Sequence, residues 1–246
     1  MKKILLAAGI VLMTSLTWAC NTTPPDYTID EAFDLMNEAI QGYLDAESLS
    51  LEYAGSYTST NYNNNEVMTV KMKNIGTDSL IGKVEMTIEE DGATFVSEIH
   101  YQDGWVYNAR TQDGETQYGK TEEPNTTYES LYMSFLKSTI AREKVVNISL
   151  EVEKDFFNIS FQLSSTVVES TLFVSNVLNT VNVAEVTLGV SHDGELMSIM
   201  VTYPATISGI SGTEQYAVSI LKLNQYVVID QLSSTEVAQY TEQTNG

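Results

Sequence analysis

The chain has 246 residues, of which 43% are hydrophobic, and it carries a formal net charge of −21 at pH 7. A polyanion of this size is repelled by nucleic acid and by anionic lipid head groups, so we expect no nucleic-acid partner. With a single cysteine the chain forms no internal disulfide, and its core has to hold itself together.

The start of the chain has the layout of an export signal. Two lysines precede an apolar run from Ile4 to Leu16, which ends shortly before Ala19 and Cys20. The run is shorter than the roughly 20 apolar residues that span a bilayer. A small residue directly before the cysteine resembles a lipobox, where bacterial lipoproteins are acylated on cysteine and cut before it. We therefore expect residues 1–19 to be a removed signal peptide and Cys20 to carry a lipid anchor.

The lipobox match is imperfect, since Thr17 stands where leucine is usual and Trp18 is bulky. The alternative is an ordinary secretory signal that leaves Cys20 as a free thiol, which is unusual in a secreted protein. Residues 20–27 contain two prolines and form the expected tether, and residues 28–246 form the expected single domain. The expected location is the extracytoplasmic face of the cell membrane, through the lipid anchor.

Three segments begin with a threonine that is followed three residues later by a glutamate, which is the pattern of a helix capping box. They predict helices over about residues 29–46, 127–142 and 166–180. The first has an apolar stripe that includes Phe33, Met36 and Ile40 at helical spacing. The third is rich in β-branched residues, which disfavour a helix, so its conformation stays open. The capping pairs are Thr28 with Glu31, Thr126 with Glu129, and Thr166 with Glu169.

Most of the remaining chain alternates apolar and polar residues with period two, which indicates strands with one wet face. Such runs cover residues 68–73, 83–89, 95–107, 157–163 and 197–203. We expect Trp105 to follow Tyr101 on the buried side, and Met197 to share a face with Ile199. Four Asp-Gly pairs, which begin at residues 91, 103, 113 and 193, predict hairpin turns. The fold class is α+β, mostly β, with a large curved antiparallel sheet and two or three covering helices.

This order of elements resembles a family of half-barrel lipoprotein carriers related to the LolA, LolB and LppX/LprG groups. The resemblance implies a half-barrel with helices in its mouth that holds acyl chains of a lipid or lipoprotein, and it supplies no catalytic residue. It rests on Cys20, the tether, the helix over 29–46 and three segments: Lys71-Met72-Lys73-Asn74, Gly82-Lys83-Val84-Glu85-Met86 and Tyr101-Gln102-Asp103-Gly104-Trp105-Val106-Tyr107-Asn108.

A cavity between the sheet and the helices would have a soft lining, because thioethers adapt to irregular ligands. For each residue taken singly, ordinary core packing is the alternative. The expected ligand-binding residues are Met36, Met68, Met72, Met86, Tyr101, Trp105, Phe135 and Met197.

The sequence shows no pattern of a catalytic, cofactor or metal site. We expect His100 to point to solvent and His192 to lie in a turn, and no Cys/His set has the spacing of a zinc site. We therefore expect a protein that is not an enzyme and needs no cofactor. It either binds a lipid or another apolar small molecule, or it has a filled core and contacts another envelope protein.

Overall fold

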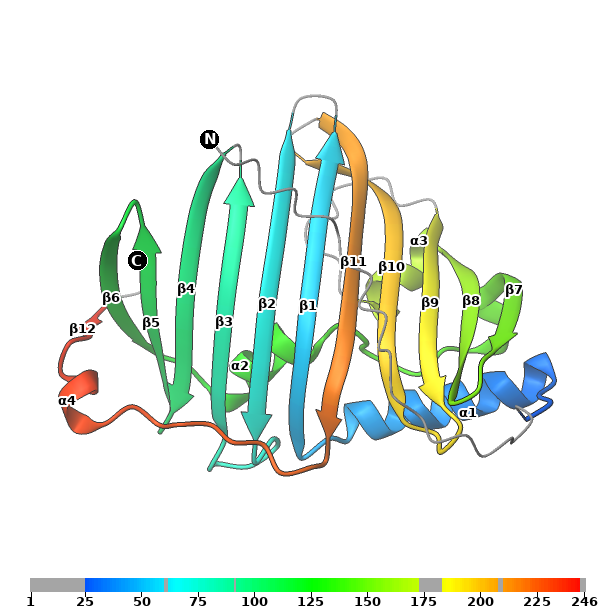
Figure 1. Cartoon of the computed structure of the whole chain (residues 1–246), viewed down its shortest axis with the longest axis horizontal. Helices are drawn as coiled ribbons and strands as arrows, with labels where there is room; N and C mark the ends of the chain where they lie inside the picture. Colours follow the sequence, from blue (N-terminus) through cyan, green and yellow to red (C-terminus); the bar gives the residue numbers. More distant parts are fainter. Residues whose placement is uncertain (1–24, 60–61, 91, 173–182, 208–209, 244–246) are drawn as a thin grey trace.

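Twelve strands of the described chain form one sheet, in the order β12-β6-β5-β4-β3-β2-β1-β11-β10-β9-β8-β7 (Figure 1). The computed structural model describes residues 25–59, 62–90, 92–172, 183–207 and 210–243. Neighbouring strands are antiparallel, except that β12 runs parallel to β6. The predicted large, curved antiparallel sheet is thus confirmed, and it is open rather than closed into a barrel.

In chain order the elements are α1 (Ile29–Leu44), β1 (Ser48–Ser59), β2 (Asn63–Lys73), β3 (Ile81–Glu90), β4 (Ala93–Gln102), β5 (Trp105–Gln112), β6 (Glu115–Glu122), α2 (Asn125–Met133), a 3-10 turn (Arg142–Lys144), β7 (Val145–Val152), β8 (Phe156–Ser164), α3 (Ser165–Thr171), β9 (Val183–Ser191), β10 (Leu196–Ile207), β11 (Ile210–Leu223), α4 (Ser234–Val237) and β12 (Thr241–Glu242).

Helix α1 begins at the predicted capping box. The backbone N–H of Glu31 donates to the Thr28 hydroxyl, and the Glu31 carboxylate accepts the Thr28 backbone N–H at 2.9 Å. The apolar stripe of the helix packs on β7, β8, β9 and β10, and both Met36 and Ile40 are fully buried there. The first predicted helix is confirmed, with its end at Leu44.

The second predicted helix is shorter than expected and has no capping box. Helix α2 covers Asn125–Met133, and its N-cap is Pro124, so Thr126 lies inside the helix. The Glu129 carboxylate does not reach back to a cap but accepts the backbone N–H of Gly76 at 2.7 Å. Residues 134–141 continue as non-helical chain.

The third predicted helix is real but short. Helix α3 begins at Ser165, one residue before the predicted cap, and ends at Thr171. Leu172 then forms an isolated bridge with Leu136, in the chain that follows α2. The rest of the predicted segment, residues 173–180, lies outside the described residues.

Two of the four Asp-Gly pairs, at residues 103 and 113, form the predicted tight turns. The pair at residue 193 lies in the longer turn between β9 and β10, and Asp91 lies outside the described residues. Asp103 and Gly104 both have positive φ, at 54° and 78°, and Asp113 and Gly114 repeat this with 53° and 82°. Two left-handed residues define the hairpin turn whose twist matches the flanking strands. Each turn joins neighbouring strands directly, β4 with β5 and β5 with β6.

The two faces of the sheet differ in what covers them. The inner face, which α1, α2 and α3 pack against, carries the main core and includes buried Leu51, Val70 and Val84 from three neighbouring strands. The helices lie behind the sheet in Figure 1. The opposite face, called the outer face below, carries the polar residues that alternate with this core.

The C-terminal chain covers part of the outer face. After β11 it crosses the lower ends of β1, β2 and β3 (Figure 1), and the Leu232 backbone N–H then donates to the Gln102 side chain on β4 at 2.9 Å. Thr241 finally pairs with Gly119 on β6. His100 lies on this covered face and is only 6% exposed, so the expectation that it points to solvent is wrong.

Candidate ligand-binding face

Six of the eight residues predicted to bind ligand lie on the inner side of the sheet. Met36 and Met72 are fully buried, so they are tightly packed core residues. The six are Met36 on α1, Met68 and Met72 on β2, Met86 on β3, Tyr101 on β4 and Phe135 in the chain after α2.

Trp105 lies on the outer face, contrary to the prediction. A two-residue turn places Gln102 directly opposite Trp105, and Tyr101 opposite Val106. Residues directly opposite share a face, so Trp105 is on the side away from Tyr101. Its ring meets the Lys120 ammonium, which lies 4.9 Å from the ring centroid.

Met197 also faces outward. The pairing of β10 with β9 shifts between Leu196 and Ser198, which is a bulge that takes in Met197. Leu196 is buried in its place, whereas Met197 is 37% exposed. A bulge adds one residue and inverts the alternation, which the sequence pattern alone does not reveal. Met197 therefore does not share the face of Ile199.

Tyrosines fix helix α2 on the inner face. Tyr128 is fully buried and stacks on Tyr101 with ring centroids 4.4 Å apart. Its ring occupies the space above Gly82, where an added Cβ would lie 2.4 Å from a ring carbon. The Tyr101 hydroxyl donates to the Glu123 carbonyl at 2.8 Å, just before the helix. The glycine on β3 thus makes room for the helix to dock.

Residues 134–141, which follow α2, are held against α1. The Asn37 side chain donates to the Ile140 carbonyl at 3.0 Å and accepts the Ile140 N–H at 2.8 Å. The Tyr43 hydroxyl donates to the Met133 carbonyl at 2.7 Å. These bonds place Phe135 over the sheet, where it stacks on Tyr53 at 5.3 Å.

Two carboxylates lie on the inner face among these aromatic rings. Glu214 on β11 is 6% exposed and pairs in register with Tyr57. Glu66 on β2 is half-buried, and its pKa is raised by burial and by the negative charge of Glu214. Burial and the charge of Glu66 also raise the pKa of Tyr132 on α2. Acidic and aromatic groups therefore meet at the centre of the inner face.

Glu66 and Glu214 are not among the site residues predicted from the sequence, although the sequence carries a signal for them. Glu66 is in phase with Met68 and Val70, and Glu214 is in phase with Tyr216 and Val218. A carboxylate on the apolar phase of a strand indicates a buried charge, which proteins rarely keep without a purpose.

Part of the inner face has a thinner cover. Helices α1 and α3 pack on β7, β8, β9 and β10, and α2 docks over the lower end of β3. Higher on the same face, Met86, Ile88 and Phe95 of β3 and β4 are only half-buried. The guanidinium of Arg110 lies 4.8 Å from the centroid of the Phe95 ring. An apolar strip therefore stays within reach of solvent.

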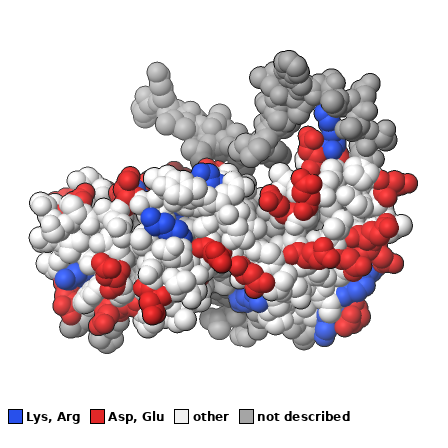
Figure 2. Space-filling view, turned by 90° about the horizontal axis from the view of Figure 1, so that it is seen from below, with Lys and Arg blue, Asp and Glu red and all other residues white. Residues whose placement is uncertain are grey.

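The molecule's surface is strongly acidic on the side seen from below, where acidic side chains outnumber basic ones (Figure 2). The ion pairs found among the described residues are few. Lys83 bridges Glu85 and Glu98 on the outer face, each at 2.9 Å, and Arg142 lies 3.7 Å from Asp30. A cation that approaches the protein therefore meets an attractive field.

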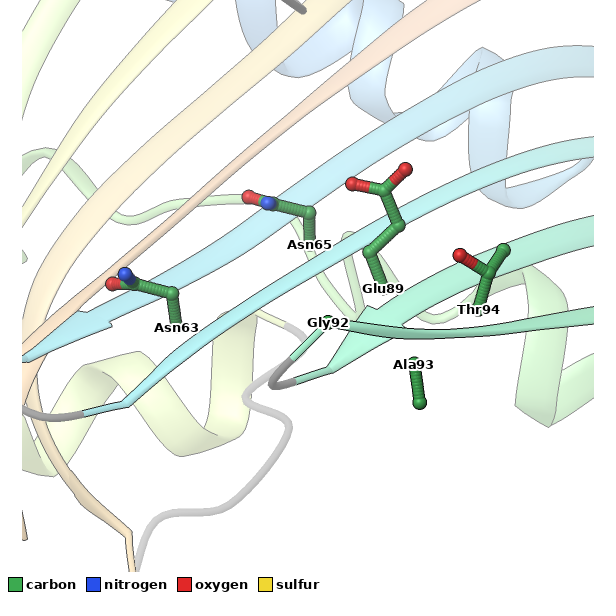
Figure 3. Close-up of a pocket in the computed structure, with 6 residues that line it drawn as sticks. All are labelled: Asn63, Asn65, Glu89, Gly92, Ala93 and Thr94. Carbon is green, nitrogen blue, oxygen red and sulfur yellow. The ribbon is translucent and has the colours of Figure 1, made fainter. Parts of the chain in front are cut away.

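A shallow hollow of about 400 Å³ lies on the outer face at the ends of β2, β3 and β4. Figure 3 shows Asn63, Asn65, Glu89 and Thr94 pointing to the same side of the sheet, and Gly92 and Ala93 close the rim. The polar lining does not suit an apolar ligand.

Neither histidine joins a cluster of catalytic groups. His100 Nε2 lies 2.9 Å from the Glu98 carboxylate on the outer face, and His192, in the predicted turn, lies 3.0 Å from the Glu153 carbonyl. Within the described ranges no group of three or more His, Cys, Asp or Glu side chains could hold a metal ion. No helix in this part of the chain has the length and apolar character needed to cross a membrane.

No protein-family model and no curated protein sequence matches the chain. Among solved structures, LprF from Mycobacterium bovis aligns with a TM-score of 0.54 and 10% identity, over 85% of this chain and 99% of LprF. The Mycobacterium tuberculosis lipoprotein LppX gives 0.46 and 11%, over 82% and 100%. A LolA superfamily protein from Nitrosomonas europaea gives 0.25 and 8%, over 80% and 94%. The likeness to LprF shows that the chain shares the fold of that protein, which agrees with the half-barrel fold that the resemblance in the sequence implies.

Proposed function

We propose that the chain is an extracytoplasmic lipoprotein, anchored through Cys20, which binds a lipid or another apolar ligand on the inner face and catalyses no reaction. One observation carries the proposal: the apolar strip at Met86, Ile88 and Phe95 is left half-buried on the part of the inner face that the helices do not cover. Apolar surface of this kind is stabilised when another apolar group covers it.

The arrangement of the cover also supports a ligand. The non-helical segment 134–141 covers the neighbouring part of the inner face, where Phe135 stacks on Tyr53 of β1, and it is held by the Asn37 and Tyr43 hydrogen bonds. A short segment tied by a few polar contacts opens at a lower free-energy cost than a packed helix does. An acyl chain could therefore enter beside it without disturbing α1.

Native mass spectrometry of the purified protein, followed by solvent extraction and lipid analysis, tests the proposal. We expect a stoichiometric lipid on the native protein, and its loss in Phe95→Glu. The matched control is Val96→Glu, because Val96 is the next residue on β4 but lies on the outer face and is 45% exposed. A protein that carries no lipid and takes up none would overturn the binding function.

The anchor is tested separately. The native protein should fractionate with membranes and be released only by detergent, whereas a protein without residues 1–20 should fractionate with the soluble proteins. Release of the native protein by salt alone would contradict anchoring through Cys20.

A second candidate function, contact with another envelope protein, is favoured by a row on the outer face. Val96, Val67 and Met200 are 45%, 48% and 45% exposed, and they stand in one line of paired residues across the sheet. Isolated exposed apolar residues are normal, but an aligned row on a flat sheet can dock a partner. If the lipid test gives a clean apo protein, this function takes precedence.

A further inference from the structure

The centre of the inner face has an unusual local geometry around Gly55. Gly55 on β1 stands directly opposite Glu66 on β2 and opposite Tyr216 on β11. A Cβ at Gly55 would lie 2.2 Å from the Tyr53 hydroxyl oxygen, so this hydroxyl occupies the space above Gly55. The missing side chain thus lets the Tyr53 hydroxyl sit between Glu66 and Tyr216.

Aromatic rings enclose this spot. The ring of Tyr53 lies 6.0 Å from that of Tyr216, and Phe135 packs at 5.3 Å and 6.3 Å from the two rings. Tyr132 on α2 packs against Tyr128 with ring centroids 4.9 Å apart, and its pKa is raised by burial and by the charge of Glu66. The rings come from two strands, a helix and the segment that follows it.

One hydroxyl in this enclosure has no partner. Tyr216 is 1% exposed, and its hydroxyl makes no hydrogen bond to any of the described residues. Tyr216 stands in one row with Gly55 and Glu66 across the sheet, and its pKa is raised by burial, by the neighbouring Tyr53 and by the charge of Glu214. Buried polar groups nearly always find a partner, so an unpaired one at an enclosed site indicates a ligand group or water.

We propose that Glu66, Glu214, Tyr53, Tyr132 and Tyr216, together the tyrosine–glutamate cluster, bind the positively charged amine or quaternary ammonium head group of an amphiphilic ligand. The inference rests on the proposed binding function and adds the head-group chemistry. The ligand's apolar chain would lie along Met86, Ile88 and Phe95, because Ile88 stands opposite Glu66 in the register of β2 and β3.

The chemistry of the cluster favours an ammonium group over other ions. Carboxylates repel a phosphate or sulfate head group, whereas the faces of aromatic rings attract ammonium groups. A hard metal ion needs six or more oxygen ligands, and the described part of the chain holds no metal-binding group of His, Cys, Asp or Glu. Glu66 and Glu214 are two strands and two residues apart in the register, or roughly 12 Å between their backbones, so both carboxylates lie beside the same group of rings.

Calorimetric titration of the purified protein with dodecyltrimethylammonium and with dodecyl maltoside, both below the concentration at which they form micelles, tests the inference. The two probes share an alkyl chain and differ in the charge of the head group. We expect the ammonium probe to bind at least about tenfold more tightly, and we expect Glu66→Gln to abolish that preference. Thermal unfolding verifies that the variant is folded.

The acidic surface of the protein would attract any cation, so a charge control is needed (Figure 2). Glu52→Gln removes one carboxylate from the outer face of β1, where Glu52 is exposed. It should keep the preference for the ammonium probe. An equal loss in both variants, or equal binding of both probes to the native protein, would overturn the head-group inference alone. Failure of both probes to bind would overturn the proposed binding function as well.

Discussion

At the residue scale, Glu66 is the position where burial and charge conflict. Its pKa is raised from 4.5 by burial and by repulsion from Glu214, so the folded protein holds this proton more tightly than the unfolded chain does. The stabilisation from this bound proton is complete at pH values below the pKa of Glu66 in the unfolded chain. It is lost as the pH rises through the pKa of Glu66 in the folded protein. At neutral pH the ionised carboxylate therefore lowers the free energy of unfolding.

Glu66→Gln should accordingly stabilise the ligand-free protein at about pH 7, and the gain should disappear at about pH 3.5, where the native carboxyl is protonated. Thermal unfolding of both proteins at the two pH values measures this. Glu52→Gln, on the outer face, should show no such gain. A gain from Glu66→Gln that persists in acid would contradict the buried charge as its cause.

A second prediction at the residue scale concerns Gly82, because Tyr128 occupies the space that a side chain at this position would need. Gly82→Ala should lower the free energy of unfolding by about 1–3 kcal/mol, as overpacking of a core does. The matched control is Gly42→Ala in α1, where a Cβ meets nothing within 4 Å. It should raise the same free energy by roughly 0.5–1 kcal/mol, since alanine favours a helix. Urea unfolding distinguishes the two, and equal effects would contradict the docking geometry of α2.

At the element scale, segment 134–141 depends on Asn37 for its position. Asn37→Ala removes both bonds to the Ile140 backbone and should lower the free energy of unfolding by about 1–3 kcal/mol. It should also speed hydrogen exchange of the Ile140 amide. Gln41→Ala is the control on the same helix, because the Gln41 side chain is exposed and donates to exposed Asp45. Unchanged exchange at Ile140 would show that the segment is held by other contacts.

The elements also show how far the sequence predicts the fold. Helix α1 could be predicted because its capping box and its apolar stripe agree. The same motif at Thr126 failed because Pro124 starts the helix earlier, and the Glu129 carboxylate bonds to Gly76, far away in the sequence. Strand faces could be predicted within one strand. The prediction of strand faces failed across the two-residue turn before Trp105 and at the bulge that includes Met197. At the bulge, one extra residue inverts the alternation.

The sequence predicts the strands better than it predicts the candidate site. Met68 and Met86 do lie on the inner face, as alternation predicts. The tyrosine–glutamate cluster brings together residues of β1, β2, β11 and α2. These elements are close because of the strand order, which the sequence pattern does not give. Nothing in the sequence indicates that Tyr53 folds over Gly55 between Glu66 and Tyr216, since this arrangement depends on the register of three strands.

At the scale of the whole molecule, the C-terminal chain protects two vulnerable surfaces. Val227 and Ile229 are buried, at 4% and 7% exposed, and α4 lies close enough to His100 for Glu236 and the imidazole to interact. Farther along, β12 pairs with β6, the first long strand at that edge of the sheet. An unpaired edge strand offers backbone groups to other chains, so this pairing limits self-association.

Two truncations separate these roles. Ending the chain at Tyr240 removes β12 and frees the edge of β6, so we expect dimers or larger species in light scattering with little change in the free energy of unfolding. Ending it at Gln225 also removes Val227 and Ile229, whose burial contributes about 1.5–3 kcal/mol each, so the free energy of unfolding should fall by at least about 3 kcal/mol. It should also speed amide exchange at His100, because the chain that covers β4 is gone. If the protein that ends at Tyr240 stays monomeric, β12 does not protect the edge of β6. If the shorter protein keeps its stability, the C-terminal chain lies on the sheet without contributing to the core.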